Sequence, residues 1–176
     1  MAFVPETGAG LSDANSYTSV ATADAYFTLR GNTTWSGAST SAKQIALVEA
    51  SKYITDTYGA NWRGSVTSTT QALDWPRGGV IDGDTQIQYD SDVIPTRLNE
   101  ATSELAVRRI AGTDLRPDMD ASADSVSSST VSVGGVSISE TFAGVQSGAP
   151  RFLVVEHRLR SLVAAGMGGS MVRVIR

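Results

Sequence analysis

Apolar residues recur every three or four positions in four stretches of the chain, which is the spacing of an amphipathic helix. Each stretch begins at a Ser, Thr or Pro and ends at a glycine, the residue types that start and stop helices. We therefore expect helices over residues 19–31, 40–59, 95–112 and 150–166. Their apolar faces are formed by Val20, Ala23 and Phe27; by Leu47, Ala50, Ile54 and Tyr58; by Ile94, Leu98, Ala101 and Leu105; and by Phe152, Val155, Leu159 and Leu162.

Between the third and fourth helices the pattern changes to alternation. Residues 121–132 hold six serines, a composition that builds no core by itself. Apolar and polar residues then alternate on both sides of Gly134-Gly135, which is a two-residue hairpin signal. Pairing Val133 with Val136 and Val131 with Ile138 places these four residues on one face. A two-stranded hairpin is only marginally stable alone, so this face must pack on the chain itself or on a neighbouring copy.

The last six residues, Met171 to Arg176, alternate apolar and basic in part and follow a glycine-rich stretch. Such a segment can add as a strand to the sheet edge of a partner, although fraying is the commoner fate of a terminus. Candidate contacts with neighbouring copies or partners are Val131, Val133, Val136 and Ile138 in the hairpin, and Val172, Val174, Ile175 and Arg176 in the tail.

These patterns predict a mainly α fold: a four-helix bundle with an inserted β-hairpin and an extended C-terminal tail. The 176 residues suit one domain, and a chain of this length buries roughly 70% of its unfolded surface. We expect a helical core over about 17–112 and 150–166, a Ser-rich segment and hairpin over 121–142, and a tail over 167–176.

The stretch Gln71-Ala-Leu-Asp-Trp-Pro-Arg77 followed by Gly78-Gly79 is typical of a rigid turn. Proline fixes its own φ and pushes the preceding residue away from the helical region. Trp75 is therefore expected to be extended, with its ring on neighbouring elements. We assign Trp75, Pro76 and Arg77 to holding the fold, and Arg77 is also a candidate for an ion pair between subunits.

Charge and composition disfavour several classes of protein. Fourteen basic and eighteen acidic residues give a net charge of −4, whereas nonspecific binding to phosphates usually needs a basic excess. The absence of cysteine excludes disulfides and thiolate chemistry. No apolar run approaches about 20 residues, and the N-terminus lacks the features of a signal peptide, so we expect neither a membrane span nor export.

The sequence offers little catalytic chemistry. The single histidine, His157, lies off the apolar stripe of its helix, so we expect it in solvent or at an interface. Asp82-Gly-Asp84 has the spacing of a tight turn, and Asp118-Met-Asp120 follows a proline in an expected loop. No glycine-rich phosphate loop is present. We therefore expect no enzyme, no cofactor and no metal site.

Tryptophans beside arginines raise the alternative of a surface on which single-stranded DNA stacks. Trp35, Trp62 and Trp75 lie in or beside expected loops, and Arg63 and Arg77 follow two of them closely. Core tryptophans with ion-paired arginines are the other interpretation. The net acidity and the presence of only two lysines favour this second interpretation.

Four segments in a recognisable order resemble a family of tailed-phage head–tail connector, or adaptor, proteins. They are Gly10-Leu-Ser-Asp-Ala-Asn-Ser-Tyr17, Ala21-Thr-Ala-Asp-Ala-Tyr-Phe27, Gln71-Ala-Leu-Asp-Trp-Pro-Arg77 and Ile94-Pro95. The resemblance covers roughly residues 9–165, and members of this group are often described as DnaT-like single-stranded-DNA-binding proteins. The Ser-rich segment and hairpin over 121–142 depart from the simplest family pattern.

The resemblance implies a four-helix bundle of the head–tail adaptor type that forms a ring, commonly a dodecamer, beneath the portal at the capsid vertex. The implied partners are other copies of the chain, the portal protein, the next connector or tail protein, and DNA that passes through without specific binding. The implied location is the virion neck, after synthesis in the cytoplasm of the bacterial host. The hairpin would either line the channel or bridge subunits, and an acidic or neutral lumen would let DNA slide.

Two alternatives stay open at this stage. One is a single-stranded-DNA-binding, DnaT-like replication protein. The other is a different ring of the same tail neck, such as a stopper or tail terminator, because these rings differ in their neighbours rather than in residue chemistry.

Overall fold

The computed structural model describes the backbone of residues 2–117, 128–133, 136–141 and 151–164, and the side chains of 2–117 and 151–164. The chain divides into two compact units: Met1–Leu115 with Phe152–Arg176, and Arg116–Arg151. The first is called the body below, and the second the hairpin unit.

The N-terminal helices of the body begin where small polar side chains cap them. α1 spans Val20–Thr28, and the Ser19 hydroxyl accepts a hydrogen bond from the N–H of Thr22 at 3.1 Å. α2 is a single turn, Thr33–Ser36, capped by Asn32. α3, Thr40–Tyr58, is capped by Ser39 and followed by Gly59. Each cap satisfies a backbone donor that the helix itself leaves unpaired.

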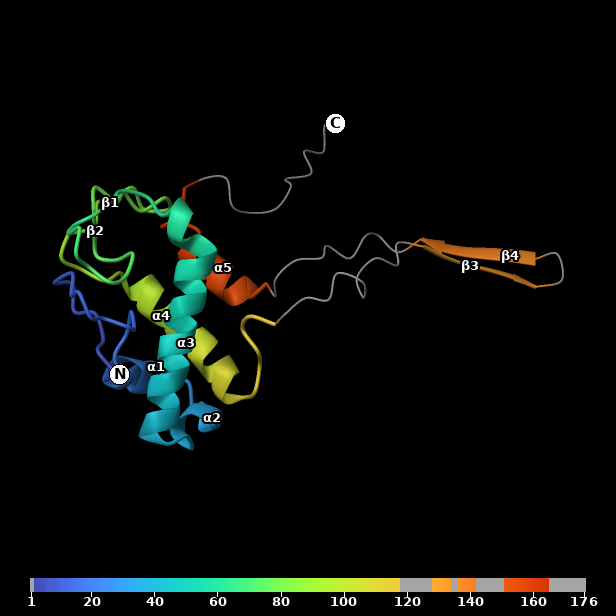
Figure 1. Cartoon of the computed structure of the whole chain (residues 1–176), viewed down its shortest axis with the longest axis horizontal. Helices are drawn as coiled ribbons and strands as arrows, with labels where there is room; N and C mark the ends of the chain where they lie inside the picture. The colour runs from blue at the N-terminus through green and yellow to red at the C-terminus, as the bar shows by residue number, and fades with distance from the viewer. Residues whose placement is uncertain (1, 118–127, 134–135, 142–150, 165–176) are drawn as a thin grey trace. The chain divides into compact units, whose positions relative to one another are not determined.

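The later helices complete the core of the body. α4, Thr96–Ile110, follows Pro95, and α5 spans Leu153–Leu159. α3 packs on α4, and α4 packs on α5 (Figure 1). The predicted apolar faces of α3, α4 and α5 point into this core, because the following residues are fully buried: Leu47, Ala50, Ile54, Leu98, Ala101, Leu105, Val155, Leu159 and Leu162.

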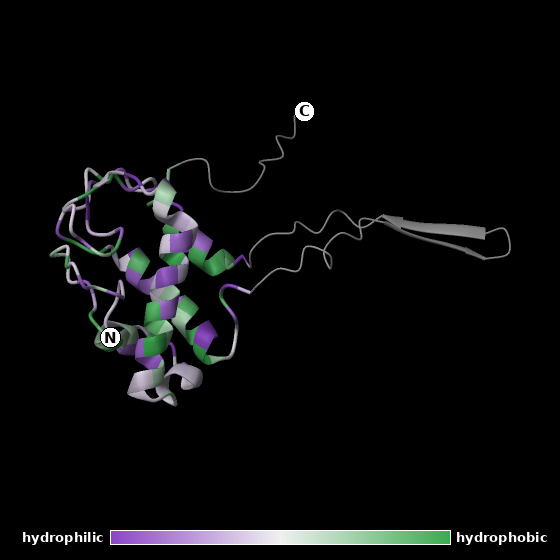
Figure 2. Cartoon of the chain, in the orientation of Figure 1, coloured by the Kyte–Doolittle hydropathy of each residue, from purple (hydrophilic) through white to green (hydrophobic). Residues whose placement is uncertain are grey.

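Residues 60–95, the loop region, contain little regular structure. After the 3-10 turn η1, Gly59–Asn61, the two-residue strands β1, Ser65–Val66, and β2, Arg77–Gly78, pair antiparallel. An isolated antiparallel bridge joins Ile81 to Gln88. In Figure 2 the loops contain purple, hydrophilic stretches, whereas green residues gather on the helices.

The loop region is joined to the end of α5 by backbone hydrogen bonds. The N–H of Arg63 donates to the carbonyl of Leu162 at 3.0 Å, and the N–H of Gly83 donates to the carbonyl of Ser161 at 3.0 Å. The N–H of Ala164 donates in turn to the carbonyl of Asn61 at 2.8 Å. Segments 78 to 103 residues apart in sequence are thereby fixed to each other.

The hairpin unit contains β3, Ser128–Val133, and β4, Val136–Thr141, paired antiparallel. Its register pairs Val131 with Ile138 and Val133 with Val136, and the predicted register is therefore confirmed. Positions two apart on a strand share a face, so the backbone places these four positions on the same side of the hairpin.

The mainly helical class predicted from the sequence is confirmed, whereas the four-helix bundle of adaptor type stays a prediction. The expected helices 19–31, 40–59 and 95–112 correspond to α1, α3 and α4. The expected helix 150–166 was too long, because the carbonyls of Ser161 and Leu162 bind the loop region instead of continuing α5. The short α2 was not predicted. Residues 165–176, which include the expected tail and its glycines, lie outside the described residues.

Candidate assembly and nucleic-acid interfaces

The Trp75–Pro76 turn lies inside the body. The peptide bond between the two residues is cis, and both residues are buried. The Trp75 ring meets the rings of Trp62 and Tyr89 edge to face, with centroids 5.8 and 6.5 Å apart. Such aromatic contacts add to the stabilisation from burial itself. This turn therefore packs within the fold and presents no ring to a partner.

Arg77 fixes the backbone around the turn. Its guanidinium donates to the carbonyls of Arg63 at 2.9 Å, Asp74 at 3.1 Å and Gly64 at 2.8 Å. Within the body this arginine therefore uses its rigid set of donors on three main-chain acceptors, and an ion pair of Arg77 between subunits stays a prediction. Arg63 behaves similarly, because its Nε donates to the carbonyl of Val163 at 3.0 Å.

Two of the motifs that carry the family resemblance meet at Asp74. The hydroxyl of Tyr17, from the Asn-Ser-Tyr motif, donates to Asp74 Oδ2 at 3.4 Å, and Trp62 Nε1 donates to the same oxygen at 3.2 Å. Burial, and then the nearby carboxylate of Asp74, raise the pKa of Tyr17 above its usual range. Contacts inside the body thus give both motifs a structural role.

Asp82 is a buried carboxylate in the loop region, with 2% of its surface exposed. Its Oδ1 accepts the N–H groups of Asp84 and Thr85, each at 2.9 Å, which forms the tight turn predicted from the sequence. Its Oδ2 accepts the hydroxyls of Tyr89 at 2.8 Å and Ser161 at 3.2 Å. This carboxylate therefore links the turn to the end of α5.

Arg97 of α4 completes the polar network around Asp82. Its Nε lies 3.7 Å from Asp82 Oδ2, and its Nη1 donates to Asp84 at 2.8 Å and to Ser161 at 3.0 Å. Burial alone would raise the pKa of Asp82, but the hydrogen bonds from Thr85, Tyr89 and Asp84 and the charge of Arg97 hold it well below its ordinary value. The network stabilises the fold through an ionised, fully bonded carboxylate.

The tryptophans offer no platform on which bases could stack. Trp35, Trp62 and Trp75 are 1%, 6% and 0% exposed. Trp35 Nε1 donates to Asp24 Oδ1 at 2.7 Å, so its polar end is also bonded inside the body. Of the two interpretations raised by the sequence, the structure agrees with core tryptophans.

Cationic side chains gather where α1 meets α4. The guanidinium of Arg30 lies 3.5 Å from the centroid of the Tyr26 ring, a cation–π contact. The Tyr26 hydroxyl donates to Glu104 at 2.7 Å, and Arg108 donates to the other oxygen of Glu104 at 2.8 Å. Burial raises the pKa of Tyr26 to about 12, and the hydrogen bond to Glu104 acts in the same direction.

α5 adds a third guanidinium to this region. Arg158 pairs with Glu100, and its charge also acts on Tyr26 and Glu104. The arginine cluster is defined here as Arg30, Arg108 and Arg158. Three cations therefore lie around two carboxylates. The phosphates of a nucleic acid would have to compete with Glu100 and Glu104 for these arginines. The charge of the cluster therefore favours nucleic-acid binding only weakly.

Of the remaining predicted candidates, His157 is exposed on α5. In the described part of the chain no three or more His, Asp or Glu residues converge as metal ligands, and no helix there is long and apolar enough to cross a bilayer. The backbone brings Val131, Val133, Val136 and Ile138 together in the hairpin unit. Residues outside the described ranges are Asp118, Asp120, Val172, Val174, Ile175 and Arg176.

Comparison with known families identifies the group to which the chain is related. The family model described as "Putative DnaT-like ssDNA binding protein" matches residues 1–176. The chain belongs to this family. No curated protein and no solved structure matches it. The family description agrees with the single-stranded-DNA-binding alternative, and the comparisons give no support to the head–tail adaptor family.

Sequence reasoning missed two features of this DnaT-like chain. The contacts of Asp82 with Ser161 and of Arg158 with Glu100 join residues 79 and 58 positions apart. No local pattern signals such pairs. The arginine cluster did have a weak signal in the sequence, because arginines are concentrated in residues 97–116 and 151–160.

Proposed function

We propose that the chain is a non-enzymatic structural subunit that works by assembling with copies of itself, as a head–tail adaptor ring between portal and tail. The observation that carries the proposal is the hairpin unit, whose register places four apolar positions on one face. A two-stranded hairpin needs another surface to cover such a face. A neighbouring copy in a ring supplies one.

The side chains of the body support this proposal. Its tryptophans are buried, and arginines such as Arg77 and Arg108 bind carbonyls and carboxylates, so many of the groups that usually recognise nucleic acid serve the fold. In the proposed ring, DNA passes through the central channel without specific binding. The ring lies in the virion neck, where its neighbours are the portal and the next tail protein. The twelvefold symmetry implied by the family resemblance belongs to the same proposal.

The test is the oligomeric state of the full chain with a hairpin variant. Val131→Ser with Ile138→Ser places polar residues at one cross-strand pair and is expected to weaken self-association by at least about tenfold, since the proposed contact would lose two apolar residues. Ser132→Ala with Ser137→Ala is the matched control, because this neighbouring pair lies on the opposite face. Sedimentation velocity and negative-stain images measure the result. If the hairpin variant and its control both assemble as well as the wild type, the proposal is refuted.

The tail gives a second test of the proposed docking on the portal. Deleting residues 170–176 is expected to leave a folded subunit that no longer binds a purified portal ring in a pull-down. Docking that persists without these residues would show that the portal is contacted elsewhere.

Single-stranded DNA binding is the second candidate function, and the family match is the observation that favours it. The arginine cluster and the exposed His157 would be the natural contacts in the body. Fluorescence polarisation with a labelled oligonucleotide separates the candidates. Micromolar binding that falls steeply with salt supports this candidate, because phosphate contacts release counterions. Absence of binding at low salt supports the structural subunit.

A further inference from the structure

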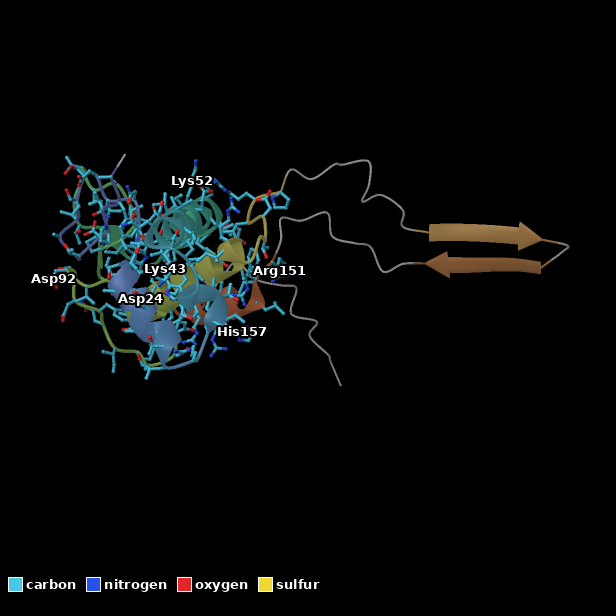
Figure 3. All side chains as sticks on the ribbon, turned by 90° about the horizontal axis from the view of Figure 1, so that it is seen from below. Asp24, Lys43, Lys52, Asp92, Arg151 and His157 are labelled. Carbon is cyan, nitrogen blue, oxygen red and sulfur yellow. The ribbon has the colours of Figure 1, made fainter. Side chains whose placement is uncertain are left out.

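Charge is distributed unevenly between the parts of the body. Residues 1–95 contain ten acidic and five basic residues, whereas residues 96–115 and 152–164, the rest of the described body, contain five arginines and four acidic residues. Figure 3 labels Asp92 at the left end of the described side chains and His157 well away from it, towards the lower right. Two faces of opposite character are therefore separated in space.

The first face lies on the outward side of α5. Val155 and Leu159 point into the core, whereas Leu153 and Val154 are 63% and 42% exposed. His157 follows them at a spacing of four and three residues, which places all three on one side of the helix. The neighbouring Arg158 belongs to the arginine cluster and keeps 34% of its side chain exposed. The α5 face thus combines an apolar centre with a cationic border.

The second face is the segment Asp90–Val93. Asp90 and Asp92 are exposed, and no hydrogen bond or ion pair of either carboxylate occurs within residues 2–117 and 151–164. Val93 beside them is 41% exposed. The acidic segment therefore combines an apolar side chain with two carboxylates that have no partner in the described body.

The acidic segment is held in a defined position. Gly8 adopts φ +100°, and a Cβ at this position would lie 1.8 Å from the carbonyl oxygen of Asp92. Only glycine permits the N-terminal loop to approach this closely. At the other end of the segment, the Tyr89 hydroxyl binds Asp82. A surface fixed in this way loses little freedom when it binds.

We propose that the α5 face of one copy binds the acidic segment of the next copy. The two faces differ in character and lie on different parts of the body, so contact between them is heterologous and propagates to a closed ring or an open filament. The apolar centre formed by Leu153 and Val154 suits Val93 better than a sugar–phosphate backbone. The carboxylates of the acidic segment, which have no partner in the described body, attract Arg158, whose side chain stays 34% exposed beside its pair with Glu100. This inference rests on the proposed self-assembly and identifies the surfaces that carry it.

A charge exchange between the two faces tests the contact in the full chain. Variant one carries Asp90→Lys and Asp92→Lys, and variant two carries Val154→Glu and His157→Glu. Each is expected to raise the dissociation constant of self-association by at least about tenfold, because like charges then face each other. An equimolar mixture is expected to assemble again, since each variant's altered face complements the other variant's altered face. Lys52→Glu is the control for variant two, because this exposed residue of α3 gives the same change of net charge.

The outcomes separate this inference from the proposed function. If the wild type assembles and both variants assemble equally well, the inference is wrong and the proposed function stands. If the wild type stays monomeric at every concentration, self-assembly fails and the inference fails with it. If variant two loses oligonucleotide binding but keeps its assembly, the α5 face is a DNA surface and the inference is overturned. Circular dichroism establishes folding, and Asp90→Asn with Asp92→Asn repeats the test with smaller changes of side chain.

Discussion

The helices and the loop region of the body are stabilised in different ways. α3, α4 and α5 bury continuous apolar stripes, in which residues such as Leu98 and Leu105 are fully buried. Residues 60–95 have only two strands of two residues each, and polar side chains organise their backbone. Gln71, Arg77 and Asp82 each bind two or more main-chain groups in this region, and Glu6 does the same in the N-terminal loop. Periodic apolar residues stabilise the helices, whereas individually placed hydrogen bonds fix the backbone of the loop region.

The largest expected effect comes from removing the aromatic anchor of the loop region. Trp75→Ala should lower the free energy of unfolding by about 3–5 kcal/mol, because it leaves a large cavity in a fully buried site. Urea denaturation measures the loss. Leu29→Ala, at a position that is 87% exposed, is the control and should change little. Equal effects of the two substitutions would mean that Trp75 does not anchor the loops.

The second prediction concerns the buried carboxylate. Asp82→Ala should destabilise the body by about 3 kcal/mol, because it leaves the hydroxyls of Tyr89 and Ser161 without their carboxylate acceptor and removes the charge that faces Arg97. Asp92→Ala removes an exposed carboxylate and should stay within about 0.5 kcal/mol of the wild type. If Asp82→Ala is as mild as its control, the polar network contributes nothing to the stability of the loop region.

Acid should weaken the loop region through the same residue. The pKa of Asp82 is depressed in the folded state, so its stabilising effect is complete above the pKa of about 4 that an unfolded Asp has. As the pH falls below 4, Asp82 binds a proton in the unfolded chain but stays ionised in the folded chain, and the free energy of unfolding therefore falls. Between pH 4 and pH 2 the wild type should lose about 1–2 kcal/mol more than Asp82→Asn does. Parallel pH profiles from urea denaturation would contradict this prediction.

The smallest expected effect lies in the N-terminal loop. Glu6 accepts the N–H groups of Thr7, Gly8 and Gly10 on one oxygen, each at 3.0 Å, and that of Leu11 on the other at 2.9 Å. Glu6→Gln replaces one of these acceptors by a donor and should cost about 1 kcal/mol. Faster hydrogen exchange at Gly10 and Leu11, with unchanged exchange in α4, would place the effect in this loop. Uniformly faster exchange would show instead that the whole body is weakened.

The same contrast explains which parts of the fold the sequence predicts. Helical periodicity and end signals locate α1, α3 and α4, because Ser19, Gly59 and Gly112 act locally. The one-turn α2 has no period to detect, and α5 is cut short by partners 78 and 99 residues away in sequence. The hairpin register follows from Gly134-Gly135 and the alternation around it.

The candidate surfaces were less accessible to prediction. Tryptophan beside arginine in a loop suits both a stacking platform and a core turn, and only burial separates the two. The acidic segment and the α5 face become visible when exposed fractions are known, because an apolar residue in sequence does not show whether it is covered. Asp82 was predicted to form a turn, and its contact with Ser161 depends on the tertiary fold.

The position of the hairpin unit in the chain has a mechanical consequence. Residues 116–151 are inserted between α4 and α5, so a force on the hairpin enters the body through two covalent connections at once. One connection leads into the apolar core through α4. The other leads through α5 into the main-chain hydrogen bonds with Arg63 and Gly83. The load is therefore shared between the helices and the loop region, and extracting α5 would require those hydrogen bonds to break together.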